Sequence, residues 1–243
     1  MSDVFGIQAV RAVLQTSPER ARSIFMQQGR RNGRINELIE LAKAAGVRHQ
    51  AMDAQWFRRR AGDEAHQGVV LECHELAMAS ESELFERLPS FGTSPLLLIL
   101  DGITDPRNFG ACLRNANAAG VDAVIVPKRN SAPLSPVALK TAQGGAEDLF
   151  IVEVTNLART MAALAQANIW MVGADGEAGL AYNEYDATGP TALVMGSEGK
   201  GLRRLTKTHC DQLVKIPMLG SVSSLNVSVA TGVLLFEMCR QRG

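Results

Sequence analysis

Three short stretches carry polar side chains of the kinds that bind anions and nucleotides. The first, "DPRNFGACLRNANAAG" (105–120), follows the apolar run "LLLIL"; the second, "GSEGKG" (196–201), follows "ALVM". The third, "GSVSSLN" (220–226), lies shortly after "LVKIP". Apolar runs of this length are typical of buried strands, and ligands gather at the carboxyl ends of the strands in parallel sheets. The sequence therefore predicts one binding cleft built from all three stretches.

Arg114 offers the clearest chemistry of the first stretch. Its guanidinium stays cationic and presents five donors and no acceptor, which suits a phosphate, a carboxylate or a developing oxyanion. We expect a turn at 106–110 to aim Asn108 and Arg114 into one cleft. Glu198, from the second stretch, is the expected ion-pair partner that holds the guanidinium in place.

The third stretch leads into the last predicted helix, 224–242. We expect Asn226 to supply an amide to the cleft and Ser224 to cap that helix. A plainer interpretation stays open, in which Arg114 and Glu198 form a structural salt bridge and Asn226 caps the helix. The residues alone thus predict an anion- or nucleotide-binding cleft and no particular reaction.

Familiar catalytic motifs are absent from the sequence. No G-x-G-x-x-G follows a predicted strand, which argues against a nucleotide-dependent oxidoreductase. "GSEGKG" resembles the end of a phosphate-binding loop, but Gly201 replaces the Ser or Thr that would bind magnesium, and Val194 replaces the first glycine. There is no G-x-S-x-G nucleophile motif, and no histidine or cysteine has the spacing of a metal ligand. We therefore expect no metal site.

The elements that must position these residues form two blocks. Residues 95–243 alternate apolar runs with helical patterns, which predicts an α/β domain with a parallel sheet covered on both faces. Residues 1–74 are expected to form a small α/β domain. Residues 75–94 have the composition of a linker, although "ESELFERL" could form a short helix.

Composition narrows the class further. The chain of 243 residues has no net charge, and 46% of its residues are hydrophobic, which is typical of a globular protein. It begins without a signal-peptide pattern and contains no apolar run long enough to span a bilayer, so we expect a cytoplasmic protein without a membrane partner. Its four cysteines lie far apart and are expected to be reduced thiols in or near the core. The basic clusters "GRRNGR" (29–34) and "RRR" (58–60) could contact phosphates or could simply be solvated.

At the three polar stretches the sequence resembles the SpoU/TrmH family of RNA ribose 2′-O-methyltransferases, which belongs to the knotted SPOUT superfamily. The motifs are "DPRNFGACLRNANAAG", "LVMGSEGKGL" and "IPMLGSVSSLNVSVATGVLLFE", in the family's order and spacing. Residues 1–74 are similar to the small substrate-binding domain of many members. Asn115 departs from the pattern, because the family more often has Ser or Thr there. We expect this difference to affect helix packing and not chemistry.

The resemblance implies a fold and a cofactor site. The C-terminal part of the sheet domain would be threaded into a deep trefoil knot, and S-adenosylmethionine would bind in that knot. Backbone groups around four residues would surround its adenosine: Gly196, Ile216, Met218 and Leu225. The family also implies a homodimer with the cleft completed near the subunit interface.

Catalytic roles follow from the same resemblance. Arg114 would lie beside the ribose 2′-hydroxyl and assist its deprotonation, either as a literal base or by electrostatic stabilisation of the alkoxide. Four further residues would orient the arginine and the ribose: Asn108, Glu198, Ser224 and Asn226. The first domain would select the RNA.

The implied substrate is a guanosine ribose in the peptidyl-transferase region of 23S ribosomal RNA, as naked RNA or in an assembling large subunit. Two alternatives within this fold stay open. One is a transfer-RNA ribose methyltransferase, against which the separate first domain argues. The other is a non-catalytic RNA-binding module, against which the intact polar residues of the three motifs argue.

Overall fold

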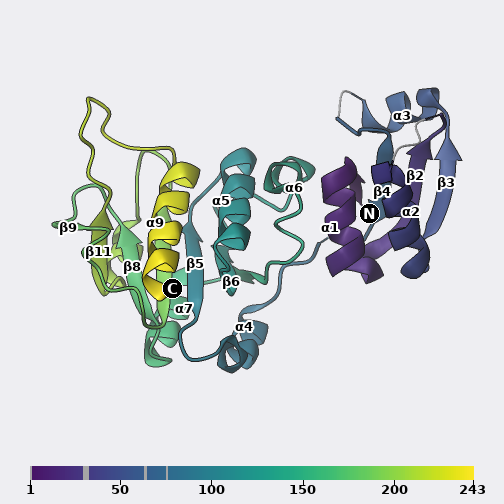
Figure 1. The fold of residues 1–243 in the computed structure, drawn as a ribbon. Helices are drawn as coiled ribbons and strands as arrows, with labels where there is room; N and C mark the ends of the chain where they lie inside the picture. The colour runs from purple at the N-terminus through teal and green to yellow at the C-terminus, as the bar shows by residue number, and fades with distance from the viewer. Residues whose placement is uncertain (1, 30–32, 63–64, 75) are drawn as a thin grey trace. The chain divides into compact units, whose positions relative to one another are not determined.

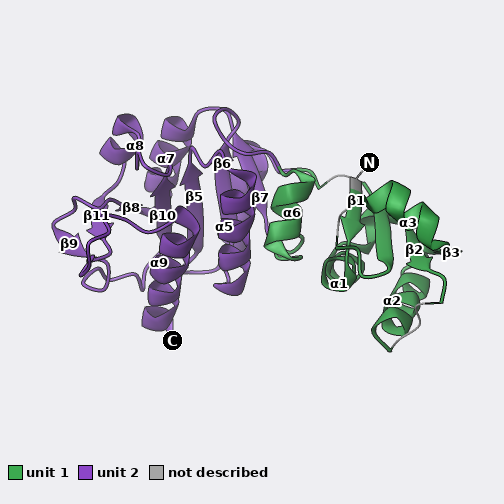
Figure 2. Cartoon of the chain, turned by 90° about the horizontal axis from the view of Figure 1, so that it is seen from above, with its two compact units in different colours: residues 1–77, 134–148 green, residues 78–133, 149–243 purple. Residues whose placement is uncertain are grey.

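The computed structural model describes residues 2–29, 33–62, 65–74 and 76–243. These residues form two compact units, coloured separately in Figure 2. Unit 1 comprises residues 1–77 and 134–148, and unit 2 comprises residues 78–133 and 149–243. No helix among the described residues is long and apolar enough to cross a membrane.

Unit 1 contains a small mixed sheet with strand order β1-β4-β2-β3, in which only β2 and β3 run parallel. Its elements are β1 (Ser2–Phe5), α1 (Ile7–Thr16), the 3₁₀ helix η1 (Pro18–Arg20), β2 (Ala21–Gln27), α2 (Gly33–Ala44), β3 (Arg48–Met52), α3 (Ala54–Ala61), β4 (Val69–Cys73) and α6 (Pro136–Ala142). Four of them were not predicted: β1, η1, β3 and α3. Strand β3 is polar and mostly exposed, so its sequence lacks the alternation that marks a half-buried strand.

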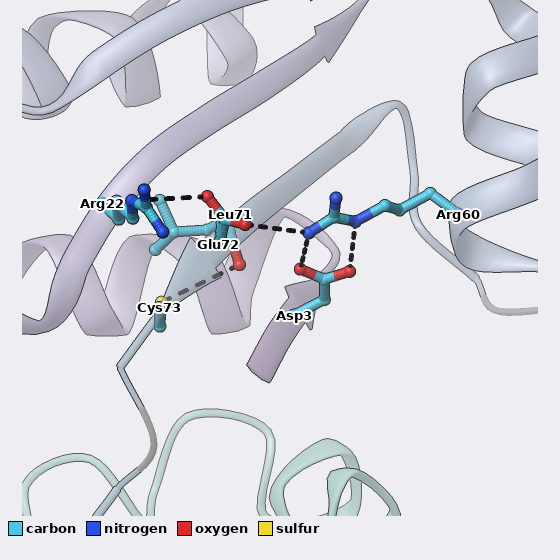
Figure 3. Close-up of polar contacts among 6 residues, drawn as sticks. All are labelled: Asp3, Arg22, Arg60, Leu71, Glu72 and Cys73. Atoms are coloured by element: carbon cyan, nitrogen blue, oxygen red, sulfur yellow. Dashed lines mark hydrogen bonds and ion pairs between the residues drawn. The ribbon is translucent and has the colours of Figure 1, made fainter. Parts of the chain in front are cut away.

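The two faces of this sheet carry separate apolar clusters. Residues such as Val10, Ile24 and Leu38 join α1, α2 and the sheet, whereas Phe25, Phe57 and Val70 pack beneath α3. Charged side chains also attach α3 to the sheet (Figure 3). Arg60 of α3 donates to Asp3 of β1 at 2.6 and 2.8 Å, and to Glu72 of β4 at 3.2 Å. These hydrogen bonds raise the pKa of Arg60, so its guanidinium stays charged.

Unit 2 is built on a parallel sheet of strand order β7-β6-β5-β10-β8-β11-β9. Among these strands Figure 1 labels β6, β5, β8, β11 and β9, and Figure 2 labels all of them. Its elements are α4 (Glu81–Arg87), the 3₁₀ helix η2 (Leu88–Phe91), β5 (Leu96–Asp101), α5 (Pro106–Ala118), β6 (Ala123–Pro127), β7 (Ile151–Val154), α7 (Leu157–Gln166), β8 (Trp170–Ala174), β9 (Leu180–Ala181), β10 (Thr191–Gly196), α8 (Arg204–Thr208), β11 (Gln212–Lys215) and α9 (Val227–Arg242). The predicted α/β class and parallel sheet are confirmed.

Helices cover both faces of this sheet, which explains why its central strands are uniformly apolar. Every residue of β5, β6 and β10 is buried. Helices α4 and α7 pack on one face through Leu84, Met161 and Leu164. Helices α5 and α9 lie together on the other face (Figure 2). Burial on both sides removes the alternation of polar and apolar residues expected of an open sheet.

The compact units differ from the expected division of the sequence in two places. Most of the expected linker belongs to unit 2, where α4 buries Leu84 completely. Residues 134–148 group with unit 1, because α6 packs against β1 and the carboxylate of Glu147 pairs with the guanidinium of Arg20. This pair is nearly buried, and desolvation lowers the pKa of Arg20.

Candidate active site

A cleft of about 700 Å³ lies in unit 2 along the segments that follow β8, β10 and β11. The cofactor-binding residues expected from the resemblance all line it: Gly196, Ile216, Met218 and Leu225. So do three of the expected catalytic residues: Glu198, Ser224 and Asn226. The predicted convergence of the second and third polar stretches on one cleft is therefore present in the structure.

Gly196 ends β10 at a point of close backbone approach. A Cβ atom there would lie 2.1 Å from the carbonyl carbon of Gly201 and 2.3 Å from the amide nitrogen of Leu202. Ser197 and Gly201 close this loop by exchanging backbone hydrogen bonds of 3.0 and 2.9 Å. Only glycine fits at position 196, because any side chain would collide with the loop that forms one wall of the cleft.

Three side chains from the three polar stretches form a hydrogen-bonded set that we call the Asn–Glu–Asn cluster: Asn108, Glu198 and Asn226. Asn108 Nδ2 donates to Glu198 Oε2 at 2.8 Å. Asn226 Nδ2 donates to Asn108 Oδ1 at 2.9 Å and to Glu198 Oε1 at 3.2 Å. The cluster links the start of α5 to the loop after β10 and to the start of α9.

Asn226 also caps helix α9, since its Oδ1 accepts the backbone N–H of Ser228 at 2.9 Å. The prediction that Ser224 caps this helix is wrong, because the helix begins at Val227, too far along the chain for Ser224 to be its N-cap. Ser224 is exposed on the cleft wall instead. The two atoms of one side-chain amide thus make different contacts: Oδ1 caps the helix and Nδ2 joins the Asn–Glu–Asn cluster.

Arg114 lies apart from the cluster, contrary to the expected turn and ion pair. Residues 106–110 are already helical, because Asp105 caps α5 by accepting the N–H of Arg107 at 2.7 Å and Pro106 occupies the first turn. Six helical residues advance the side-chain direction by about 600°, so Asn108 and Arg114 point roughly 120° apart. Arg114 is exposed and has no hydrogen bond or ion pair with any described residue. Glu198 is bound by two asparagines instead.

Asn115, the departure from the family pattern, packs between two helices as expected. Its Nδ2 donates to the carbonyl oxygen of Ser228 in α9 at 2.7 Å, and it lies against Gly232. It therefore stabilises the contact of α5 with α9.

A fully buried carboxylate beneath the cleft loop was not predicted to have a structural role. Asp101, at the end of β5, accepts a 2.6 Å hydrogen bond from the hydroxyl of Thr206, and its Oδ1 lies 3.2 Å from Arg203 Nε. Arg203 directly follows the loop of residues 197–202, so this ion pair anchors the loop to the sheet. The spacing of these residues in the sequence gives no sign of the contact.

The described residues offer neither a metal centre nor a reactive thiol. No group of three or more His, Cys, Asp or Glu side chains among them could hold a metal ion. All four cysteines are free. Burial raises the pKa of Cys73 and Cys112 to about 11 and that of Cys210 to about 12, so these thiols stay protonated near neutral pH.

Comparison with known proteins places this site in a family. Residues 95–236 match the SpoU rRNA Methylase family, and residues 4–79 match the family described as RNA 2'-O ribose methyltransferase substrate binding. The chain is 51% identical over 240 residues to the 23S rRNA (guanosine-2'-O-)-methyltransferase RlmB of Yersinia pestis, with 99% of this chain and 97% of that protein covered.

Solved structures agree with the sequence match. The SpoU methyltransferase AviRb from Streptomyces viridochromogenes, solved in complex with the cofactor AdoMet, is 26% identical with a TM-score of 0.82, over 99% of this chain and 90% of its own. A TrmH/SpoU tRNA modifying enzyme from A. aeolicus is 29% identical with a TM-score of 0.55, over 67% of this chain and 84% of its own. The predicted family is thereby confirmed: the chain belongs to the SpoU rRNA methylase family.

Proposed function

We propose that this protein methylates the 2′-hydroxyl of a guanosine ribose in 23S ribosomal RNA, with S-adenosylmethionine as the methyl donor. The observation that carries the proposal is the convergence of the three motif segments through the Asn–Glu–Asn cluster beside the cleft. The full-length match to 23S rRNA guanosine methyltransferases supports the substrate and the reaction. We place the reaction in the peptidyl-transferase region of the RNA and in the cytoplasm, where ribosomal RNA of bacteria is found.

The cleft fits a cofactor of this kind. Its volume of about 700 Å³ is within the range of roughly 300–1,000 Å³ for small-molecule sites. Ile216, Met218 and Leu225 offer apolar surface for a purine, and Gly196 contributes backbone without a side chain. Bound S-adenosylmethionine would supply an activated methyl group on a positively charged sulfur.

Arg114 is the residue that we assign to the ribose. Its guanidinium would lie at the 2′-oxygen and stabilise the negative charge that grows there as the proton leaves. Because Arg114 is exposed and has no partner among the described residues, its guanidinium can make such a contact. The Asn–Glu–Asn cluster would hold the start of α5, and Ser224 and Asn226 would orient the ribose from the cleft wall.

A homodimer would bring Arg114 to a cleft that it does not line in its own chain. Val229 and Phe236, seven residues apart on one face of α9, are each about half exposed, with exposures of 52% and 51%. Leu219 and Val222, on the segment between β11 and α9, are exposed by 100% and 60%. Apolar surface of this kind marks a protein interface, and its position beside the third motif supports a cleft completed by a second copy.

We also propose that the C-terminal segment is threaded into the trefoil knot of the SPOUT superfamily. The path of residues 216–226 supports this proposal, because these residues leave β11 and return to α9 beside the loop after β10 along the same cleft.

A methyl-transfer assay with two RNAs tests the function and its alternatives. The protein should transfer tritiated methyl groups from S-adenosylmethionine to a 23S rRNA transcript and leave a transfer-RNA transcript unlabelled. Label on the transfer RNA alone would favour the tRNA-modifying alternative. Binding of 23S rRNA without transfer, in the presence of bound cofactor, would favour a non-catalytic RNA-binding module.

A further inference from the structure

Three of the described residues that line the cleft of unit 2 carry carboxylates: Asp175, Glu177 and Glu198. Asp175 lies 2.5 Å from Lys207 Nζ, and Glu198 accepts hydrogen bonds from two asparagines. Glu177 is exposed, and its side chain makes no hydrogen bond or ion pair with a described residue. Of these three carboxylates, Glu177 is therefore the one that is left for a ligand.

The backbone that carries Glu177 is fixed at several points. Asp175 donates its N–H to the carbonyl oxygen of Val214 in β11 at 2.9 Å, which attaches the start of the turn to the sheet. The carbonyl oxygen of Asp175 accepts the N–H of Ala178 at 3.1 Å, and its Oδ1 accepts the N–H of Glu177 at 2.9 Å. The hydrogen bond from Lys207 lowers the pKa of Asp175, so this carboxylate stays ionised near neutral pH. A free side chain on a fixed turn can bind a ligand without the cost of first ordering the loop.

The strand order places Glu177 between the segments that are expected to surround the adenosine of the cofactor. Strand β8 lies between β10 and β11 in the sheet. Gly196 ends β10 and Ile216 follows β11, whereas Glu177 follows β8 at the same edge. The Asn–Glu–Asn cluster joins the loop after β10 to the helix that follows β5, on the side of β10 away from β8. Glu177 is thus placed for the nucleoside half of the cofactor, away from the cluster beside which methyl transfer is proposed.

We propose that Glu177 binds the ribose of S-adenosylmethionine, with its two carboxylate oxygens accepting hydrogen bonds from the 2′- and 3′-hydroxyls. The inference rests on the proposed function, because it assumes that this cleft holds the cofactor. An ionised carboxylate only accepts hydrogen bonds, and a vicinal diol offers two donors, so the two groups are complementary. Dinucleotide-binding enzymes hold a ribose hydroxyl with an Asp or Glu in the same way. The sulfonium has no proton to donate, so the other group that Glu177 could bind is the ammonium of the methionine moiety.

Calorimetric titration of Glu177→Ala with S-adenosylhomocysteine tests the contact in the full-length protein and requires no methyl transfer. The side chain of Glu177 has no partner among the described residues, so the variant should fold and keep its unfolding midpoint in urea. We expect the Kd for S-adenosylhomocysteine to rise about 10- to 100-fold, as the loss of hydrogen bonds to a charged group implies.

Two further ligands identify the part of the cofactor that Glu177 binds. The 2′,3′-dideoxy analogue of S-adenosylhomocysteine lacks the diol, so the variant and the unmodified protein should bind it equally within twofold. 5′-Methylthioadenosine keeps the diol and lacks the amino acid, so the variant should bind it more weakly by the same factor as S-adenosylhomocysteine. A variant that weakens the binding of S-adenosylhomocysteine but not of methylthioadenosine would overturn the assignment, because Glu177 would then contact the ammonium group.

Glu86→Ala is the matched control, because it removes an exposed glutamate of α4 that has no described partner and does not line the cleft. This control should bind all three ligands as the unmodified protein does. A Glu177→Ala variant that behaves like the control would overturn the inference and leave the proposed function intact. Failure of the unmodified protein to bind S-adenosylhomocysteine would contradict the proposed function itself, and the inference with it.

Discussion

Replacing Arg114 by alanine should separate stability from catalysis. Arg114 lies in the middle of α5, and its side chain is exposed and has no partner among the described residues. Its removal therefore leaves no carboxylate without its ion-pair partner. Alanine is at least as good a helix former, and the free energy of unfolding should change by less than about 0.5 kcal/mol. If the guanidinium stabilises charge at the ribose oxygen, kcat should fall by about 10²–10³, or roughly 2.7–4 kcal/mol.

Three measurements on this variant are needed: urea unfolding, calorimetric titration with S-adenosylmethionine and single-turnover methyl transfer. Cofactor affinity should stay within several-fold. Arg114→Lys keeps the charge but not the planar fork of donors, so it should recover only part of the rate. Arg204→Ala is the control, since Arg204 is also exposed and lies on α8, across the sheet from α5 (Figure 2).

Two outcomes would refute the role assigned to Arg114. A variant with more than half of the normal kcat would show that the guanidinium does not act at the reacting oxygen. A variant that no longer binds the cofactor, or that unfolds at a much lower urea concentration, would make Arg114 a cofactor-binding or folding residue.

Further predictions follow from the loop, the cluster and the thiols. Gly196→Ala should lower the free energy of unfolding in urea by more than about 4 kcal/mol or prevent folding, because its Cβ would collide with the loop backbone. Gly189→Ala is the control, since a Cβ at position 189 meets no atom within 4 Å. Equal unfolding midpoints for the two variants would contradict the close approach. Glu198→Gln should lower kcat/KM about 3- to 10-fold in steady-state assays, since an amide nitrogen cannot accept a hydrogen bond from an asparagine; unchanged kinetics would show that the cluster is dispensable. Burial raises the pKa of Cys73 and Cys112 to about 11, so at pH 8 both thiols should react with Ellman's reagent at least about 100-fold more slowly in the native protein than after unfolding. Rapid labelling of either site in the native protein, mapped by mass spectrometry, would contradict their burial.

The sheet of unit 2 could be predicted because burial on both faces makes its strands almost wholly apolar. Strand β3 could not be predicted, because its residues Arg48–Gln50 are exposed and polar and show no alternation of apolar and polar residues. Strand β1 is short and includes Ser2 and Asp3, so the β-strand propensity of its residues does not predict it either. Residues 134–148 look like one more helix of the second block, and only their tertiary contacts group them with unit 1.

Strand ends of a parallel sheet share one edge, so all three polar stretches were expected to meet, and Asn108, Glu198 and Asn226 lie together. The expected partner of Glu198 was wrong. The partner of Glu198 depends instead on where α5 begins, and Pro106 was interpreted as part of a turn when it forms the first turn of the helix. The contact of Asp101 with Arg203 likewise depends on the path of a loop, which no local pattern encodes.

Nucleoside analysis of the reaction product tests the central claim most directly. A 23S rRNA transcript treated with the protein and S-adenosylmethionine would be digested to nucleosides and examined by mass spectrometry, and the modified position mapped by arrested reverse transcription. We predict 2′-O-methylguanosine at one position in the peptidyl-transferase region, formed by the unmodified protein and reduced at least about 100-fold by Arg114→Ala. A methyl group on a base, or on the ribose of another nucleoside, would contradict the proposed reaction.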